Sequence, residues 1–330
     1  GIDTISVFVR AAIFLFGLVI FGQGNKSLGT IVAISSYASY FWQPIMNLGN
    51  IFNNFINNIA YLERIFETID EPVTVKDAEH AIKMPKIRGK VTFDHVTFAY
   101  DETKTILKDV SFTVNPGESV ALVGPTGAGK STIVNLISRF YNVNDGKVLI
   151  DDQDIADVTI HSLRAQMGIM MQDSFIFSGT IADNIRYGKL DATQEEIEKA
   201  GKIVCADPFI REMPKGYETQ VRERGSMLSQ GQKQLISFAR TLLCDPAILI
   251  LDEATSSIDV QTEKALQTGL NRMLKGRTSF IIAHRLSTIR GCDKIMYIDD
   301  GGIAEAGTHE ELMKKKGRYY KLYTAQKSLH

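Results

Sequence analysis

Residues 124–132 have the spacing G-x-x-x-x-G-K-S-T, which is typical of loops that bind phosphate groups. Glycines let such a loop turn tightly, so several backbone N–H groups can converge on a polyphosphate without interference from Cβ atoms. Lys130 is expected to reach the β- and γ-phosphates, and the Ser131 hydroxyl is expected to hold Mg²⁺. Residues 119–123 read as a buried strand before the loop, and 131–137 as the helix after it, so the sequence predicts a nucleoside triphosphate site. The expected members of this site are Gly124, Thr126, Gly127, Gly129, Lys130, Ser131 and Thr132.

Two carboxylates follow an apolar run at 247–251, which is typical of a strand that is buried on both faces. Asp252 and Glu253 would emerge at the carboxyl edge of the sheet, where ligands of open α/β sheets bind. Asp252 is expected to hold Mg²⁺ directly or through water, and Glu253 to polarise a water for in-line attack on the γ-phosphate. Acidic residues that merely end a core strand are the alternative, and the phosphate loop upstream argues against it.

A third element is the segment 228–235, Leu-Ser-Gln-Gly-Gln-Lys-Gln-Leu, which leads into another helical run. Ser229 followed by Gln232 has the S-x-x-Q form of a capping box, so Ser229 is the expected N-cap. A helix start with a hydroxyl and with Gly231 nearby is a second potential anion site. On its own, such a box indicates only a helix terminus.

The length, net charge and cysteine content limit the number of domains and the kinds of ligand that this chain can bind. The 330 residues allow two domains of ordinary size, and 37 basic against 38 acidic residues give a net charge of −1. That balance provides no electrostatic argument for binding nucleic acid. Cys205, Cys244 and Cys292 lack C-x-x-C spacing, so they are interpreted as buried or incidental thiols in a reducing compartment and not as metal ligands or disulfide partners. The first residue is Gly1, which indicates a fragment of a longer polypeptide, and no signal peptide is expected.

The first sixty residues carry only three charged side chains, Asp3, Arg10 and Lys26. Apolar segments at about 5–22 and 28–60 predict two transmembrane helices, joined by a short polar turn. Serines and asparagines recur at three- and four-residue steps along the second segment, as in a helix that faces a bundle interior or a wet cavity. A helical hairpin buried in a soluble core is the alternative, but these residues contain no turn that would let them wrap into a compact domain.

Charge returns at Glu63, and a polar stretch follows. We therefore predict a membrane part over 1–70 including a cytoplasmic extension, a linker over 71–86 and a nucleotide-binding domain over 87–330. Within the last of these, residues 90–98 and 110–114 alternate between apolar and polar side chains. This pattern favours a small antiparallel subdomain beside the main sheet.

The combination of these elements resembles the ATP-binding cassette (ABC) exporters, specifically the C-terminal part of a half-transporter, over essentially the whole chain. The signature of that family is L-S-G-G-Q, and this chain has Gln230 at its third position. The resemblance implies an α/β P-loop ATPase domain with a mostly parallel core sheet, an antiparallel β subdomain and an inserted helical subdomain, preceded by an all-α transmembrane hairpin.

The resemblance also implies residue roles. Tyr100 is similar to the aromatic residue that stacks on adenine, and Gln172 to the glutamine that touches Mg²⁺ or the attacking water. Asp259 is similar to the acidic residue of the D-loop, and His284 to the histidine that contacts the γ-phosphate. Glu223–Gly225 resembles the loop before the signature in exporters. The implied catalytic residues are Glu253, His284 and Gln172, the further nucleotide contacts are Ser229, Gly231, Gln232 and Asp259, and the metal ligands are Ser131, Gln172 and Asp252.

ATP and Mg²⁺ are the implied cofactors, and a second half-transporter is the implied partner, so that two subunits enclose two ATP molecules. The resemblance further implies a protein of the bacterial plasma membrane, with its ATPase domain in the cytoplasm, that moves a small molecule, lipid or peptide and binds no nucleic acid. An importer with the exporter fold remains an alternative, and so does a regulatory subunit with a slow ATP site. The presence of Lys130, Asp252, Glu253 and His284 argues against the regulatory subunit. A homodimer and a heterodimer both remain open.

Overall fold

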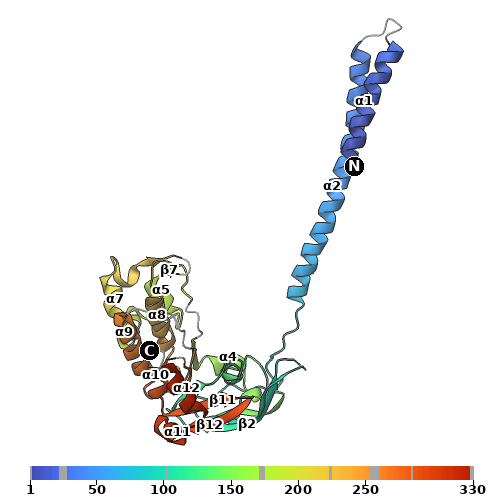
Figure 1. Cartoon of the computed structure of the whole chain (residues 1–330). Helices are drawn as coiled ribbons and strands as arrows, with labels where there is room; N and C mark the ends of the chain where they lie inside the picture. Colours follow the sequence, from blue (N-terminus) through green and yellow to red (C-terminus); the bar gives the residue numbers. More distant parts are fainter. Residues whose placement is uncertain are drawn as a thin grey trace. The chain divides into compact units, whose positions relative to one another are not determined.

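The computed structural model describes residues 2–21, 28–101, 103–170, 175–222, 225–252, 260–283 and 285–327. The chain divides into two compact units, Gly1–Val73 and Thr74–His330 (Figure 1).

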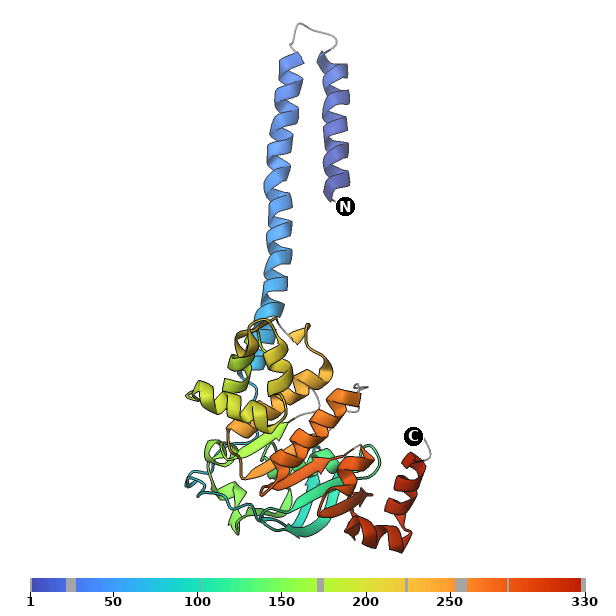
Figure 2. The ribbon, with the colours of Figure 1, turned by 90° about the vertical axis from the view of Figure 1, so that its left-hand side faces the viewer.

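The first unit consists of two helices, α1 (Ile2–Phe21) and α2 (Leu28–Ile69), which lie side by side (Figure 2). They approach closely at Gly17, where an added Cβ would lie 3.2 Å from the Ile31 side chain. The second helix contains Pro44, and the Ser36 hydroxyl within it donates to a carbonyl one turn earlier. Both predicted segments are therefore helical. Across the described residues, however, no helix combines the length and the apolar character that crossing a membrane requires.

The second unit contains a six-stranded sheet with the order β12-β11-β3-β10-β9-β6. Its strands are parallel except β12, which pairs antiparallel with β11, so the predicted mostly parallel core sheet is confirmed. All five residues of β3 are buried, as expected for a strand covered on both faces. The strands are β3 (Ser119–Val123), β6 (Met167–Met170), β9 (Ile248–Asp252), β10 (Thr278–Ile282), β11 (Lys294–Asp299) and β12 (Gly302–Gly307).

An antiparallel sheet with the order β2-β1-β4-β5 forms the predicted subdomain. The pairing of β1 with β2 has several register shifts, which interrupt the simple alternation of side chains. The strands are β1 (Val91–Ala99), β2 (Thr105–Val114), β4 (Asp145–Ile150) and β5 (Gln153–Asp154), and a separate small ladder joins β7 (Gly179–Thr180) to β8 (Gln220–Val221).

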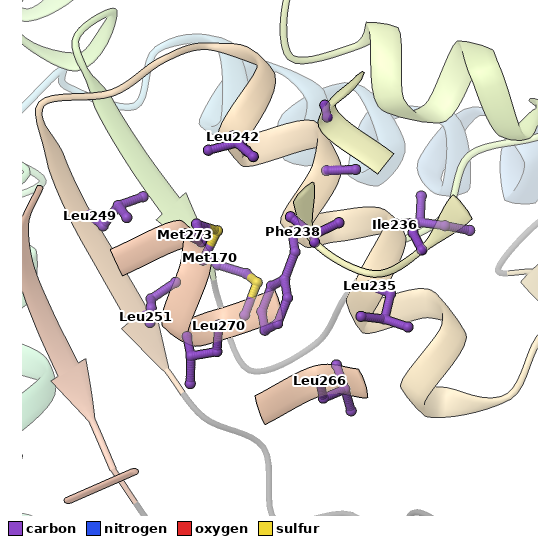
Figure 3. Close-up of a cluster of buried hydrophobic side chains, with 14 of the residues drawn as sticks. Met170, Leu235, Ile236, Phe238, Leu242, Leu249, Leu251, Leu266, Leu270 and Met273 are labelled. Atoms are coloured by element: carbon purple, nitrogen blue, oxygen red, sulfur yellow. The ribbon is translucent and has the colours of Figure 1, made fainter. Parts of the chain in front are cut away.

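Helices cover both faces of the core sheet, and α5 to α8 form the inserted helical subdomain. Alternate residues of the central strands face two different hydrophobic cores, one of which packs against α8 and α9 (Figure 3). This packing fixes α8 against the strands β6 and β9. The α-helices are α3 (Lys130–Ile137), α4 (Ile160–Arg164), α5 (Ile181–Arg186), α6 (Gln194–Ile203), α7 (Asp207–Glu212), α8 (Gln230–Leu243), α9 (Val260–Leu274), α10 (Leu286–Arg290), α11 (His309–Lys315) and α12 (Arg318–Lys327), and the 3₁₀ helices are η1 (Ile155–Asp157) and η2 (Gly216–Glu218).

Most of the segment predicted as a linker packs within the second unit. Ile82 forms an isolated parallel bridge with Val158. Met84 is buried, and its backbone N–H donates to the Ser162 hydroxyl at 2.8 Å. Within the second unit the segment is held from Lys76 onward, where the Lys76 carbonyl oxygen accepts from Arg139 and the Asp77 side chain accepts from the Ile160 N–H.

Candidate functional site

The phosphate loop connects β3 to α3, as the sequence predicts, and its glycines have positive φ angles. Gly124 has φ 141°, and a Cβ added there would lie 2.1 Å from the Ile298 carbonyl oxygen. Gly129 has φ 109°, and its added Cβ would meet the Leu107 side chain at 2.8 Å. Gly127 also has a positive φ, of 79°, but nothing lies within 4 Å of its added Cβ. Gly124 and Gly129 thus permit close packing of the loop against its neighbours. Gly127 has no neighbour there, which leaves room beside the loop for phosphate groups.

Helix α3 begins directly after Gly129 without a side-chain cap. The first N–H groups of any α-helix have no carbonyl partner within the helix, and the helix dipole makes that end partly positive. Because no side chain caps this terminus, those N–H groups are available to an anion. The structure therefore gives the loop the donor set that a polyphosphate requires.

The Lys130 ammonium group donates to the carbonyl oxygens of Gly124 and Pro125, both at 2.8 Å. Burial lowers the pKa of this amine, while the negative charge of Asp252 acts in the opposite direction. Ile282 of β10 pairs with Asp252 on one side and with Leu122 of β3 on the other, so Asp252 and the phosphate loop follow parallel strands at the same edge of the sheet. A cation and a carboxylate at this edge are what Mg²⁺–triphosphate binding needs.

The carboxylate of Asp252 ends β9, where Asp252 pairs in register with Ile282 of the parallel strand β10. Among the described residues, no group of three His, Cys, Asp or Glu side chains could hold a metal ion by itself. Mg²⁺ does not require such a group, since it is commonly bound by one or two protein ligands together with phosphates and water. The hard oxygen atoms of Ser131 and Asp252 fit that pattern, so these residues can hold the ion.

Tyr100 lies beside the phosphate loop. Its hydroxyl is 3.1 Å from the Thr132 hydroxyl, and about half of the residue, 48%, is exposed. Two further rings contact it: Phe98, with ring centroids 4.9 Å apart, and Tyr141, also at 4.9 Å. Tyr141 was not among the predicted site residues, and its only sequence signal is the aromatic pair Phe140–Tyr141 just after the predicted helix.

The capping box predicted at the start of α8 is confirmed. The Gln232 N–H donates to the Ser229 hydroxyl at 3.2 Å, and the Ser229 N–H donates to the Gln232 side chain at 3.0 Å. Gly231 is buried in the first turn. These residues lie in the helical subdomain, so the structure assigns them to a different element from the phosphate loop.

Gln172, Glu253, Asp259 and His284 lie outside the described residues, as do Glu223 and Arg224. Thr126 lies in the described loop between β3 and α3. Hydrogen bonds join Tyr100 to Thr132 and Lys130 to Gly124. Gly127 and Gly129 lie in the same loop, and Asp252 ends a strand at the same edge of the sheet.

A phosphate loop between a buried strand and a helix, with a carboxylate at the end of a nearby parallel strand, defines a P-loop nucleotide-binding domain. Residues 107–256 match the family model described as "ABC transporter". A bacterial Atm1-family ABC exporter, solved with ATP bound, matches with a TM-score of 0.75 and 40% identity, over 98% of this chain and 57% of the exporter chain. The chain belongs to the ABC transporter family.

Two curated relatives agree with this assignment. An ABC transporter ATP-binding protein of Bacillus subtilis, YknV, is 49% identical over 318 residues, which are 96% of this chain and 53% of the relative. A fatty acid ABC transporter ATP-binding/permease protein of Mycobacterium bovis is 44% identical over 302 residues, which are 92% of this chain and 48% of the relative. The chain thus spans about half the length of the curated relatives it matches.

Proposed function

We propose that this chain is the C-terminal, ATP-hydrolysing part of an ABC exporter half-transporter, and that its ATPase domain drives movement of a cargo across a membrane. The observation that carries the proposal is the loop between β3 and α3, where Lys130 lies on the carbonyl oxygens of Gly124 and Pro125 beside an uncapped helix start. Asp252 ends a parallel strand at the same edge of the sheet. Together they offer N–H and ammonium donors to a triphosphate and a carboxylate to a divalent cation. The ABC exporter with ATP bound, matched at 40% identity, supports the same function.

In the proposed reaction the phosphates lie on the backbone N–H groups of the loop, and Lys130 exchanges its carbonyl partners for phosphate oxygens. Mg²⁺, when bound, neutralises charge that develops on the phosphate oxygens. Glu253 accepts a proton from the attacking water, and Gln172 and His284 orient that water and the γ-phosphate. Tyr100 stacks on the adenine ring, next to the phosphate loop.

The signature residues Ser229, Gly231 and Gln232, together with Asp259, act on the ATP of a second subunit in this proposal. Binding of ATP would then join two ATPase domains, and hydrolysis would release them. The partner is either a second copy of this chain or a different half-transporter. The first unit would belong to the membrane part of the transporter, with the ATPase domain in the cytoplasm of a bacterium.

The cargo class proposed is a small molecule, lipid or peptide. The name of the fatty acid transporter relative favours an amphipathic or lipid cargo among these. The serine and asparagine steps along α2 are compatible with such a cargo, although helix packing alone also uses small polar residues.

The test is a Glu253→Gln variant of the whole chain, compared with Glu195→Gln, which changes an exposed glutamate in the first turn of α6. Glu253→Gln should still bind ATP, lose most of its turnover, and form a dimer in Mg²⁺-ATP but not in ADP, as measured by light scattering. Glu195→Gln should keep wild-type turnover. Wild-type turnover in Glu253→Gln would overturn the assignment of Glu253 as the general base. Failure of the wild-type chain to bind ATP would overturn the proposed function.

A further inference from the structure

The turn that follows α3 is fixed by the side chains of two arginines, which donate hydrogen bonds to backbone carbonyl oxygens. Arg139 is only 2% exposed and has a left-handed φ of 50°. Its guanidinium group donates to the carbonyl oxygens of Val158 and, at 3.0 Å, Lys76. A buried arginine whose donors are satisfied by backbone carbonyls fixes the path of the chain on both sides of itself.

A second arginine secures the same turn from α4. The Arg164 guanidinium group donates to the carbonyl oxygens of Ser138 at 3.0 Å and Arg139 at 2.7 Å. It also lies over the Phe140 ring, 4.6 Å from the centroid. The two arginines thus leave the backbone around Phe140 little freedom, and the next residue, Tyr141, projects from a rigid support.

Tyr141 uses that support to contact the proposed base-stacking residue. Its ring meets Tyr100 edge-to-face, with centroids 4.9 Å apart and planes at 85°. Phe98 contacts both rings, at 4.9 Å from Tyr100 and 5.7 Å from Tyr141. Edge-to-face contacts of this kind favour one orientation of the contacted ring.

The other end of Tyr100 is tied to the phosphate loop, through the hydroxyl contact with Thr132 at 3.1 Å. Thr132 is buried in α3. The Tyr100 ring is therefore held by two aromatic side chains and by the helix that starts at the phosphate site, yet it remains 48% exposed. A stacking surface with these properties is oriented before any base arrives.

We infer that Tyr141 is a positioning residue for nucleotide binding: it holds the Tyr100 ring in the orientation in which a purine stacks. This inference rests on the proposed function, since it assigns a role within the same ATP site. Tyr141 would then affect the recognition of the base and leave the recognition of the phosphates unchanged. A purely structural role for the turn would weaken both.

The experiment compares two ligands on the whole chain: Mg²⁺-ATP and Mg²⁺-tripolyphosphate, which has the phosphates without the base. Binding is measured by calorimetry for wild type, Tyr141→Leu and Tyr141→Phe. Tyr141→Leu should weaken ATP binding about five-fold, which corresponds to the loss of one aromatic pair, and should leave tripolyphosphate binding unchanged. Tyr141→Phe keeps the ring edge and should retain wild-type affinity for ATP.

Tyr187→Leu provides the matched control, because Tyr187 is another exposed tyrosine with a ring neighbour, Phe177, in the helical subdomain. It should bind both ligands as the wild type does. Equal weakening of both ligands in Tyr141→Leu would overturn the inference, and so would unchanged ATP affinity. A wild-type chain that binds neither ligand would instead contradict the proposed function, so the two failures are distinguishable.

Discussion

Two helices of the ATPase domain begin in regions that are expected to contact nucleotide, and they begin in opposite ways. Helix α3 starts after Gly129 in a left-handed conformation and has no side-chain cap. Helix α8 starts after Ser229 in an extended conformation and has a complete capping box with Gln232. The first terminus leaves its N–H groups to a ligand, whereas the second satisfies some of them with its own side chains.

The difference indicates what each terminus can do alone. A helix N-terminus without a cap is less stable than a capped one, but its N–H groups can bind an anion. Helix α3 therefore lacks the stabilisation of a cap and has N–H groups for a phosphate instead. The capped end of α8 is stable without a ligand. It can contact a nucleotide only through groups that the box leaves available, such as the backbone around Gly231, or by exchanging the Ser229 contact for a phosphate oxygen.

The largest expected effect comes from the cation at the uncapped terminus. Lys130→Ala removes the charge that faces the phosphates, so ATP turnover should fall by about 100- to 1,000-fold. Steady-state phosphate release measures this effect. Lys233→Ala, in the first turn of α8, is the control and should lose at most a small part of the activity. If Lys130→Ala and Lys233→Ala lose similar amounts of ATP turnover, the start of α3 has no special role in binding the phosphates.

A smaller effect, on stability, should separate two glycines of the phosphate loop. Gly124→Ala should lower the free energy of unfolding by about 2–4 kcal/mol, because the new Cβ would lie 2.1 Å from the Ile298 carbonyl oxygen in a left-handed conformation. Gly127→Ala has no such clash and should cost only about 1 kcal/mol. Denaturant unfolding gives both values. Equal costs would show that close packing does not determine the shape of the loop.

The smallest expected effect is on the capped terminus. Ser229→Ala should lower the free energy of unfolding by about 1 kcal/mol, since it leaves the Gln232 N–H without its side-chain acceptor. Ser229→Thr keeps an acceptor at that position and should stay close to wild type. Denaturant unfolding of the two variants is the measurement. If Ser229→Ala leaves the free energy of unfolding unchanged, the capping box does not stabilise α8. The starts of α3 and α8 would then not differ in stability in the way described.

Local patterns predicted β3, β9, β1 and part of β2, whereas the core strands β6, β10, β11 and β12 were not predicted. The alternation at 90–98 and the apolar run at 247–251 correspond to β1 and β9, each displaced by one residue. The pattern at 110–114 found only the second half of β2, which begins at Thr105. Register shifts between β1 and β2 break the alternation there, because a bulge sends two neighbouring side chains to the same face.

The sequence could not predict contacts between residues that are distant along the chain. Nothing in the polar composition of 71–86 indicated that the carbonyl of Lys76 accepts from Arg139, or that Met84 is buried. The ring of Tyr141 was missed for the same reason. Its contact with Tyr100 depends on how a turn after α3 meets the end of β1.

The sequence by itself determined the phosphate loop, the capped start of α8 and the buried strand before Asp252, because each depends on residue types at fixed short spacings. The tertiary structure decided which of these elements act together. It placed Asp252 at the same edge of the sheet as the phosphate loop, joined Tyr100 to Thr132 and placed Tyr141 against Tyr100. The physical reason is that these contacts depend on the order of strands in the sheet and on the path of buried turns. Both are set by the packing of the whole domain.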